Sequence, residues 1–319
     1  MPLAKWNFES KDNLIKWIVP DGDFVPFPEF ANPIQKAVMP IIALADEKLI
    51  AVGTGFTIGA DGYMITAAHV VEEFGQPRVA KRDGSGYYNN ISLYALHITD
   101  KRHGPENKYY MGGLWPIYKA HFVPGLDIAV CSLQEAKING EKYTFPSVKL
   151  SFKPPKVGEY ILCCGYYKSG GEVTIEKLVA NYSQNNALSK GKVVEVFFPR
   201  RDLSAINWPC FHITARIEGG MSGGPVFNES GSVCGVMCRS FAEPNDQGEY
   251  TSYCSTLWPA LGTLVEVKFS PDCPVETIPL YDMVKKGAIP VDETFDQINF
   301  IMNPDGSRSI SAPHWLGQS

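Results

Sequence analysis

Hydrophobic residues in this chain come in short runs rather than in the long amphipathic repeats of helices. The runs are rich in β-branched and aromatic residues and are bounded by Gly, Asn, Asp and Pro, a pattern typical of β-strands. Strands are expected at residues 52–58, 63–67, 91–98, 128–133, 143–150, 160–166, 173–182, 193–198, 211–215, 225–227, 233–238 and 250–257. Many short strands separated by turns predict an all-β barrel or sandwich.

Turn, loop and helix signals divide these strands. The Gly-Ala-Asp-Gly sequence at 59–62 predicts a hairpin, and the Pro-containing segment 151–155 predicts a linker between two halves. Spaced apolar residues at 275–286, followed by Gly287, predict a helix with a glycine after its last turn. Long loops are expected at residues 81–90, 101–113, 183–191 and 243–249.

The most informative segment is 219–225, Gly-Gly-Met-Ser-Gly-Gly-Pro. Its glycines tolerate positive φ, so they leave the Ser222 hydroxyl reachable and turn successive N–H groups into one concavity. A serine becomes a good nucleophile only when a base takes its proton. His69 in Thr-Ala-Ala-His-Val and Asp127 in Gly-Leu-Asp-Ile-Ala-Val supply a base and a group that orients it. Together the three segments predict a serine hydrolase.

The Gly-x-Ser-x-Gly pattern around Ser222 also occurs in the nucleophile elbow of α/β-hydrolases. An elbow turns from a strand into a helix, and its triad runs in the order Ser, Asp or Glu, His. Here residues 225–227 favour a strand, and the only histidine after Ser222 is His314. The order His69, Asp127, Ser222 is instead that of chymotrypsin-type enzymes, so the elbow is excluded.

The three segments resemble those of the trypsin-like (chymotrypsin-fold) serine peptidases. The resemblance is closest to the disulfide-free bacterial branch of the HtrA/Deg proteases, without a PDZ domain, and to the glutamyl endopeptidases. It covers residues 35–265 and is carried by 53–58, 61–63, 65–69, 157–166 and 211–239. It implies two six-stranded antiparallel β-barrels followed by a C-terminal helix.

The resemblance also implies how the chain is divided. An N-terminal extension is expected at 1–34, a first barrel carrying His69 and Asp127 at 35–150, and a second barrel carrying Ser222 at 151–270. A C-terminal helix and tail are expected at 271–319.

The family's mechanism carries over to the matching residues. It implies a serine endopeptidase in which Ser222 is the nucleophile, His69 the general base and Asp127 the residue that orients the imidazole. The N–H groups of Gly220 and Ser222 would form the oxyanion hole of an acyl-enzyme mechanism. The alternative is a catalytically silent or partner-gated binding protein with the same fold. The intact set of three residues favours the enzyme.

The specificity pocket of the family is built by two segments on either side of the nucleophile. They match Arg216, Ile217, Cys238, Arg239 and Ser240. Arg216 at the base of the pocket would repel Lys and Arg side chains and favour acidic ones. The alternative is that Arg216 turns outward and pairs with Glu218. Cys238 stands where the family has a serine beside the catalytic aspartate.

The composition of the chain argues against some classes of binding partner. A net charge of −5 without a basic block argues against nucleic acid, and no apolar run reaches membrane length. The chain start lacks a secretory signal, so we expect a cytoplasmic protein whose eight cysteines are reduced and buried. No metal is expected at Cys234 and Cys238, because four strand residues span about 13 Å. No cofactor is expected. The expected partners are a protein or peptide substrate and a regulatory protein docked on the N-terminal extension or the C-terminal tail.

Overall fold

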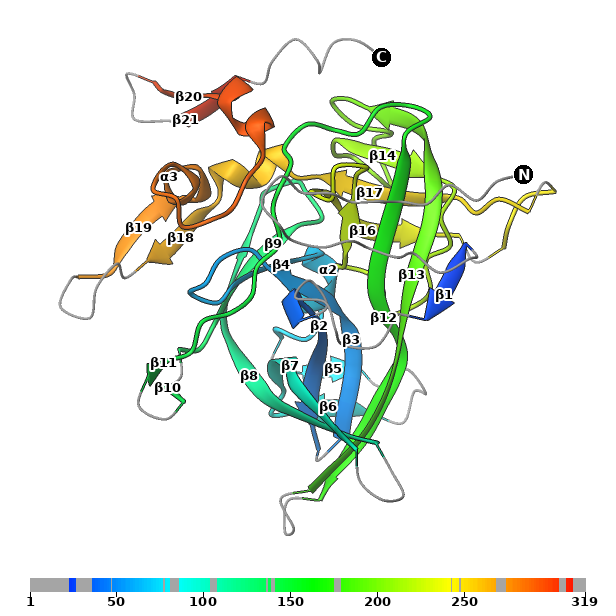
Figure 1. Ribbon diagram of the computed structural model, residues 1–319, viewed down its shortest axis with the longest axis vertical. Helices are drawn as coiled ribbons and strands as arrows, with labels where there is room; N and C mark the ends of the chain where they lie inside the picture. The colour runs from blue at the N-terminus through cyan, green and yellow to red at the C-terminus, as the bar shows by residue number, and fades with distance from the viewer. Residues whose placement is uncertain are drawn as a thin grey trace.

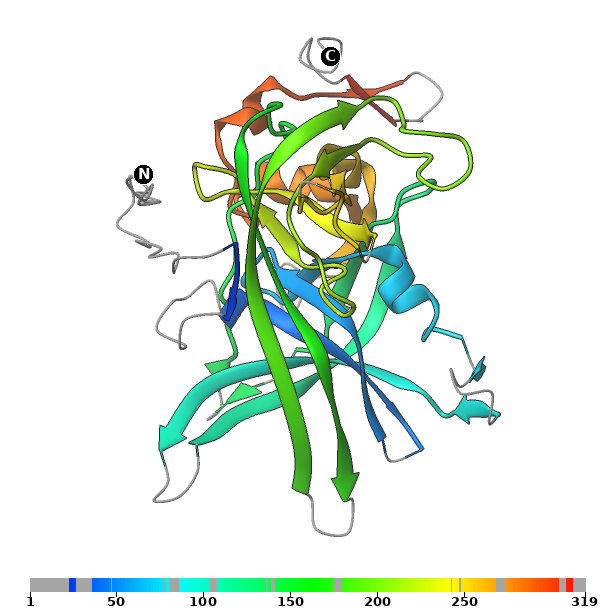
Figure 2. The same cartoon turned by 90° about the vertical axis from the view of Figure 1, so that its right-hand side faces the viewer.

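Strands dominate the computed structural model of this chain, in which two closed six-stranded antiparallel β-barrels lie against each other (Figure 1). Both barrels and their long hairpins are visible again in the perpendicular view (Figure 2). The structure describes residues 23–26, 36–46, 48–76, 78–80, 86–103, 108–135, 137–138, 141–174, 179–241, 243–246, 248–267, 274–303 and 308–311. The expected all-β class and the expected pair of barrels are confirmed. The domain boundaries given above stay predictions.

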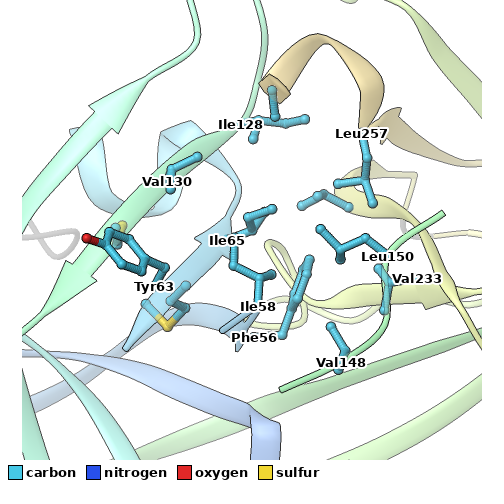
Figure 3. Close-up of a cluster of buried hydrophobic side chains, with 14 of the residues drawn as sticks. Phe56, Ile58, Tyr63, Ile65, Ile128, Val130, Val148, Leu150, Val233 and Leu257 are labelled. Carbon is cyan, nitrogen blue, oxygen red and sulfur yellow. The ribbon is translucent and has the colours of Figure 1, made fainter. Parts of the chain in front are cut away.

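The first barrel is closed by strand pairing in the order β2-β7-β8-β9-β4-β3, with β3 returning to β2. Its strands are β2 (Val38–Ala45), β3 (Lys48–Thr57), β4 (Tyr63–Thr66), β7 (Ser92–His103), β8 (Lys108–Phe122) and β9 (Ala129–Leu133). Two short hairpins lie outside it, β5 (Arg78–Ala80) with β6 (Tyr87–Asn89) and β10 (Lys137–Ile138) with β11 (Glu141–Lys142). Buried apolar side chains fill the barrel, among them Phe56, Ile65 and Val130 (Figure 3).

The second barrel is closed in the order β12-β13-β14-β17-β16-β15, with β15 returning to β12. Its strands are β12 (Tyr160–Thr174), β13 (Val179–Phe197), β14 (Cys210–Ile213), β15 (Pro225–Phe227), β16 (Val233–Ser240) and β17 (Ser252–Thr256). One further strand, β1 (Phe24–Pro26), does not belong to either barrel and pairs with the edge of β13. The far end of β12 pairs with β3, so the two barrels are also joined through a continuous ladder.

The C-terminal part packs on the hydrophobic core of the first barrel through residues such as Leu261, Val265 and Leu280. It consists of η2 (Trp258–Gly262), β18 (Leu264–Val267), β19 (Glu276–Pro279), α3 (Leu280–Lys285), η3 (Glu293–Gln297), β20 (Asn299–Met302) and β21 (Arg308–Ser311). No helix within the described residues is long and apolar enough to cross a membrane.

The expected helix at 275–286 is only partly correct. Its first half is strand β19, and the helix begins directly after Pro279, which is extended with ψ 150°. Proline fixes φ and lacks an N–H, so it is tolerated at a helix start but not inside one. Gly287 ends the helix as expected, with φ +75°, and its N–H donates to the Val284 carbonyl (2.9 Å).

Three other expectations from the sequence are wrong. Residues 143–150 form no strand apart from an isolated bridge at Leu150, and Pro146 lacks the N–H that a ladder needs. The loops expected at 101–113 and 183–191 are instead strand in their described residues. The strand expected at 173–182 is confirmed at 173–174 and 179–182, which belong to β12 and β13, while residues 175–178 lie outside the described residues. Polar residues in these long ribbons resemble loop sequence, but they are ordered by pairing with the neighbouring strand.

The loops expected at 81–90 and 243–249 have different outcomes. Residues 87–89 form β6, and 81–85 lie outside the described residues. The described part of 243–249 contains no strand, as expected.

Seven of the eight cysteines lie in the described part of the chain, and all seven are buried with free thiols, as expected. Cys273 lies outside the described residues. Burial raises the pKa of these thiols where a shift is resolved, for example to about 12 for Cys131. The seven cysteines thus pack as small side chains of the protein interior.

Candidate active site

The strand register of the first barrel brings His69 and Asp127 together. Helix α2 (Ala68–Glu72) begins two residues after the end of β4, and β9 begins two residues after Asp127. Thr66 of β4 pairs with Ala129 of β9, so the two side chains leave the sheet at neighbouring points. Residues that are 58 positions apart in the sequence are thus placed side by side by the pairing of two short strands.

Asp127 holds His69 through the imidazole and the backbone together. The ring Nδ1 lies 2.8 Å from Oδ2 and 3.0 Å from Oδ1, and the backbone N–H donates to Oδ1 at 3.0 Å. The Asp127 side chain is 12% exposed, whereas that of His69 is 49% exposed. Burial alone would raise the pKa of Asp127, but the hydrogen bonds and charge of His69 lower it below its usual value. These contacts hold the imidazole with Nδ1 toward the Asp127 carboxylate.

Ser222 lies in the turn that precedes β15. Gly220 and Gly223 on either side have φ +102° and +85°, which favour glycine. A Cβ at Gly223 would lie 2.1 Å from Thr66 Oγ1, so this glycine is also required by close packing. The turn is fixed by hydrogen bonds from Met221 N–H to the Glu218 carbonyl (3.0 Å) and from Gly223 N–H to the Met237 carbonyl (2.7 Å).

Ser222 and His69 line one cleft together with Gly220. The Ser222 hydroxyl donates to the Cys238 carbonyl at 3.5 Å and forms no hydrogen bond with His69. Among the described residues, no group accepts a hydrogen bond from the N–H of Gly220 or of Ser222. The two N–H groups of the expected oxyanion hole are therefore available at the cleft.

Thr54 contacts this site, although the sequence analysis assigned no role to it. It is completely buried on β3, and its hydroxyl donates to the Gly220 carbonyl (2.8 Å) while accepting from the Tyr166 N–H (3.0 Å). Its own N–H donates to the Ser222 carbonyl at 2.8 Å. A signal was present, because two glycines flanking a hydroxyl residue within a strand mark a close approach of another backbone.

Cys238 lies beside Asp127, as the resemblance implied. Its Sγ is 3.5 Å from the Asp127 carbonyl and 3.0 Å from Ser255 Oγ. Burial raises the pKa of the Cys238 thiol well above its usual value, so the group is neutral. Contact with this thiol is one of the smaller influences that lower the pKa of Asp127.

The expected specificity residues are spread over different surroundings. Arg216 pairs with Glu218: its Nε donates to Glu218 Oε1 at 2.6 Å, and its Nη2 donates to the same oxygen. Its guanidinium carbon lies 4.6 Å from the Phe24 ring centre. Arg239 is exposed and donates to the Ala205 carbonyl (3.4 Å). The structure thus shows no unpaired Arg216 charge that would attract an acidic side chain.

The other specificity residues are apolar or uncharged. Ile217 packs against the buried core of the second barrel. The hydroxyls of Ser240 and Ser252 lie 2.8 Å apart, and Ser252 donates to the Ala215 carbonyl at 2.8 Å. The hydroxyl groups on this side of the nucleophile therefore already have hydrogen-bond partners.

Comparisons with known proteins bear on the family of this chain. Residues 53–236 match the family model described as trypsin-like peptidase domain. No curated protein matches the sequence.

Three solved structures illustrate the similarity. Deg5 is 18% identical with a TM-score of 0.43 over 70% of this chain and 87% of its own. The MamO protease domain of Magnetospirillum magneticum is 14% identical with a TM-score of 0.40, over 70% and 94%. The inactive form of the Rv3671c protease of M. tuberculosis is 18% identical with a TM-score of 0.37, over 75% and 93%. These similarities are too distant to indicate a substrate.

Proposed function

This chain is a serine endopeptidase of the trypsin-like peptidase family, and we propose that it cleaves peptide bonds with Ser222 as nucleophile, His69 as general base and Asp127 as the orienting carboxylate. The observation that supports this assignment is that the Asp127 carboxylate forms hydrogen bonds with both the ring Nδ1 and the backbone N–H of His69. A carboxylate in that position sets the imidazole tautomer and stabilises the imidazolium that forms when it takes a proton.

The chemistry follows from the positions of the three side chains. Rotation of the Ser222 side chain away from the Cys238 carbonyl brings its hydroxyl toward Nε2 of His69, which takes the proton as Oγ attacks the substrate carbonyl. Nε2 then gives that proton to the leaving amine, and an acyl-enzyme remains on Ser222. Water, activated by the same imidazole, releases the acid product.

The developing oxyanion would be held by the N–H groups of Gly220 and Ser222. Both lack a protein acceptor among the described residues, and both adjoin the cleft. Losing one such donor typically costs about 10²–10³ in kcat. The backbone geometry that positions these two groups is therefore part of the catalytic apparatus.

The cleft suits an extended peptide chain. On one side of His69 it is lined by Tyr166, Tyr167 and Gly219. A second groove, which also includes His69 and Asp127, is lined by Phe122, Pro124, Trp208 and Arg239 among others. A substrate strand running through both would pass the scissile bond in front of Ser222, which favours a protein or peptide substrate over a small ester.

A fluorophosphonate probe, which reacts with activated serines, tests the proposal directly. The wild-type protein should be labelled at Ser222, and Ser222→Ala should not be labelled. His69→Ala should lose labelling while keeping the wild-type melting temperature. Absence of wild-type labelling, alone and in the presence of peptide substrate, would contradict the proposal and favour a catalytically silent binding protein.

A further inference from the structure

Strand β1 lies on an edge of β13 that the second barrel itself leaves open. β14 pairs with β13 only at residues 193–197, whereas β1 pairs with residues 187–189 farther along the same edge. The Lys190 N–H also donates to the Asp23 carbonyl at 2.8 Å. An unpaired strand edge exposes backbone donors and acceptors, so the short β1 completes the ladder at this position.

Phe24 of β1 contacts two residues that come from separate parts of the second barrel. Its ring meets Tyr167 edge-on, with ring centres 5.5 Å apart at 70°. On the other side the Arg216 guanidinium lies over the Phe24 ring at 4.6 Å, and the Tyr250 ring centre is 5.8 Å from the same guanidinium. Phe24 therefore links β12 to the segment that leads into the nucleophile.

Both of these residues support the oxyanion loop, which we define as residues 217–222. Arg216 holds the Glu218 carboxylate, and the Glu218 carbonyl accepts the Met221 N–H at 3.0 Å. From the opposite side, Gly220 lies against the backbone of β12. A Cβ added there would be 2.9 Å from the Tyr166 oxygen and 3.3 Å from Tyr167 Cα. The loop is thus enclosed by the two residues that Phe24 touches.

The loop needs such support because of its own composition. Two successive glycines, Gly219 and Gly220, have the largest backbone freedom to lose. The Arg216–Glu218 pair is partly exposed, with side chains 41% and 24% exposed, and an isolated pair of this kind contributes little by itself. Aromatic rings against the guanidinium reduce the conformations available to Arg216 and so keep its hydrogen bonds to Glu218 in place.

We propose that Phe24 is a positioning residue for the oxyanion hole: β1 docks on β13, and its ring holds Arg216 and Tyr167 so that the Gly220 N–H faces the cleft. This inference rests on the proposed function for its kinetic consequence, since the hole acts only on a substrate. The interaction with the oxyanion is stronger in the transition state than in the bound substrate. Loss of Phe24 should accordingly lower kcat while leaving KM nearly unchanged.

The test compares Phe24→Ala, Phe24→Leu and Phe24→Tyr in the full chain with wild type. Val25→Ala is the matched control, because Val25 is the next residue of β1 and packs on the first core instead. Phe24→Ala should lower kcat about tenfold, a partial loss of one oxyanion donor. Phe24→Leu keeps the apolar volume and should fold, yet show a similar loss. Phe24→Tyr should restore the rate, and Val25→Ala should leave it within twofold.

Amide hydrogen exchange of the peptide covering 214–224 gives a second readout that needs no activity. Exchange at 217–221 should become faster in Phe24→Ala and Phe24→Leu, but not in Phe24→Tyr or Val25→Ala. Wild-type exchange and kcat in the first two variants would overturn the proposal, as would equal losses in Val25→Ala. A wild-type protein without any labelling or cleavage would refute the proposed function, while the exchange data would still decide the role of Phe24.

Discussion

The Thr54 hydroxyl donates a hydrogen bond of 2.8 Å to the Gly220 carbonyl, joining a strand of the first barrel to the oxyanion loop of the second. The same residue donates its N–H to the Ser222 carbonyl and accepts the Tyr166 N–H. His69 belongs to the first barrel and Ser222 to the second, so their relative position depends on contacts between the barrels. Thr54 provides three of these contacts from one buried side chain and its backbone.

Replacing Thr54 by valine should lower both the stability and kcat. The valine keeps the shape but removes the hydrogen bonds of the Thr54 hydroxyl with the Gly220 carbonyl and the Tyr166 N–H, and losing a buried hydrogen bond costs about 1–3 kcal/mol. Thr54→Ser should retain most of the rate. Thr57→Val is the matched control, because the buried Thr57 hydroxyl of the same strand bonds to the carbonyls of Ala37 and Pro146, away from the loop. Chemical denaturation and steady-state kinetics measure the two effects, and a kcat loss equal to that of Thr57→Val would refute the specific role.

Single substitutions in the proposed triad should abolish most cleavage without unfolding the protein. Ser222→Ala, His69→Ala and Asp127→Asn should each lower kcat about 10⁴-fold or more. In Asp127→Asn the amide can still contact His69 Nδ1 but favours the wrong tautomer. Peptide cleavage and circular dichroism together check this. Turnover near the wild-type level in Ser222→Ala would show that another group is the nucleophile.

Most residues of the candidate site were predictable from the sequence because they lie in short local motifs. His69, Asp127 and Ser222 are each flanked by glycines or by a predicted strand, so the local backbone at each residue can be inferred from its neighbours. Their order along the chain favours the chymotrypsin-type fold over the α/β-hydrolase fold. Contacts between distant segments were not predictable in the same way. The hydrogen bonds of Thr54 and the stacking of Phe24 on Arg216 depend on a register that only the folded barrels establish.

The long ribbons show a second limit of sequence patterns. Residues 183–186, Ser-Gln-Asn-Asn, have the composition of a loop, yet Ser183, Asn185 and Asn186 pair directly with residues of β12. In such a hairpin the strand is stabilised by its partner and not by burial of its own side chains. The opposite error occurs at 143–150, where Phe145, Val148 and Leu150 are buried anchors of an irregular segment rather than a strand face.

Cys238 should influence the rate through Asp127. Its neutral thiol is a weak donor beside the carboxylate that orients His69, and a hydroxyl donates more strongly. Cys238→Ser should therefore equal or exceed the wild-type rate, while Cys238→Ala should lower kcat several-fold with little change in KM. Peptide kinetics at fixed pH measure both. If Cys238→Ala were as active as wild type, the thiol would have no part in supporting Asp127.

Acid should destabilise the first barrel through His97. This side chain is fully buried, with Nε2 2.5 Å from the Tyr143 hydroxyl, and burial lowers its pKa to about 4. The unfolded chain then binds a proton at His97 between about pH 6.5 and 4, where the folded chain does not, so stability falls as the pH drops through this range. The effect is at most about 3 kcal/mol, because one pKa unit corresponds to about 1.4 kcal/mol.

Urea denaturation of wild type and His97→Phe at pH 7.5 and 4.5 tests this assignment. Phenylalanine keeps an aromatic ring beside Tyr143 and Phe145 and does not titrate. The variant should lose less stability than wild type on acidification. An identical loss in both proteins would assign the acid sensitivity to other groups.

Substrate preference should not depend on the charge of Arg216. The structure pairs Arg216 with Glu218 and covers it with Phe24, so an acidic side chain next to the scissile bond gains no free cation there. We expect cleavage after small apolar residues and little cleavage after Lys or Arg, since the buried Ala215 and the partnered Ser240 and Ser252 offer no carboxylate.

The Arg216→Ala variant distinguishes a specificity pocket without a free cation from one in which Arg216 binds acidic side chains. In a peptide library the variant should cleave every substrate more slowly by a similar factor, because Glu218 and the oxyanion loop lose their support, while the ranking of acidic against apolar peptides stays the same. A selective loss of cleavage after Glu or Asp would instead place the Arg216 guanidinium in the substrate pocket during catalysis. Strong cleavage after Lys or Arg by the wild-type protein would contradict the assignment of the pocket itself, since a carboxylate would then have to lie within it.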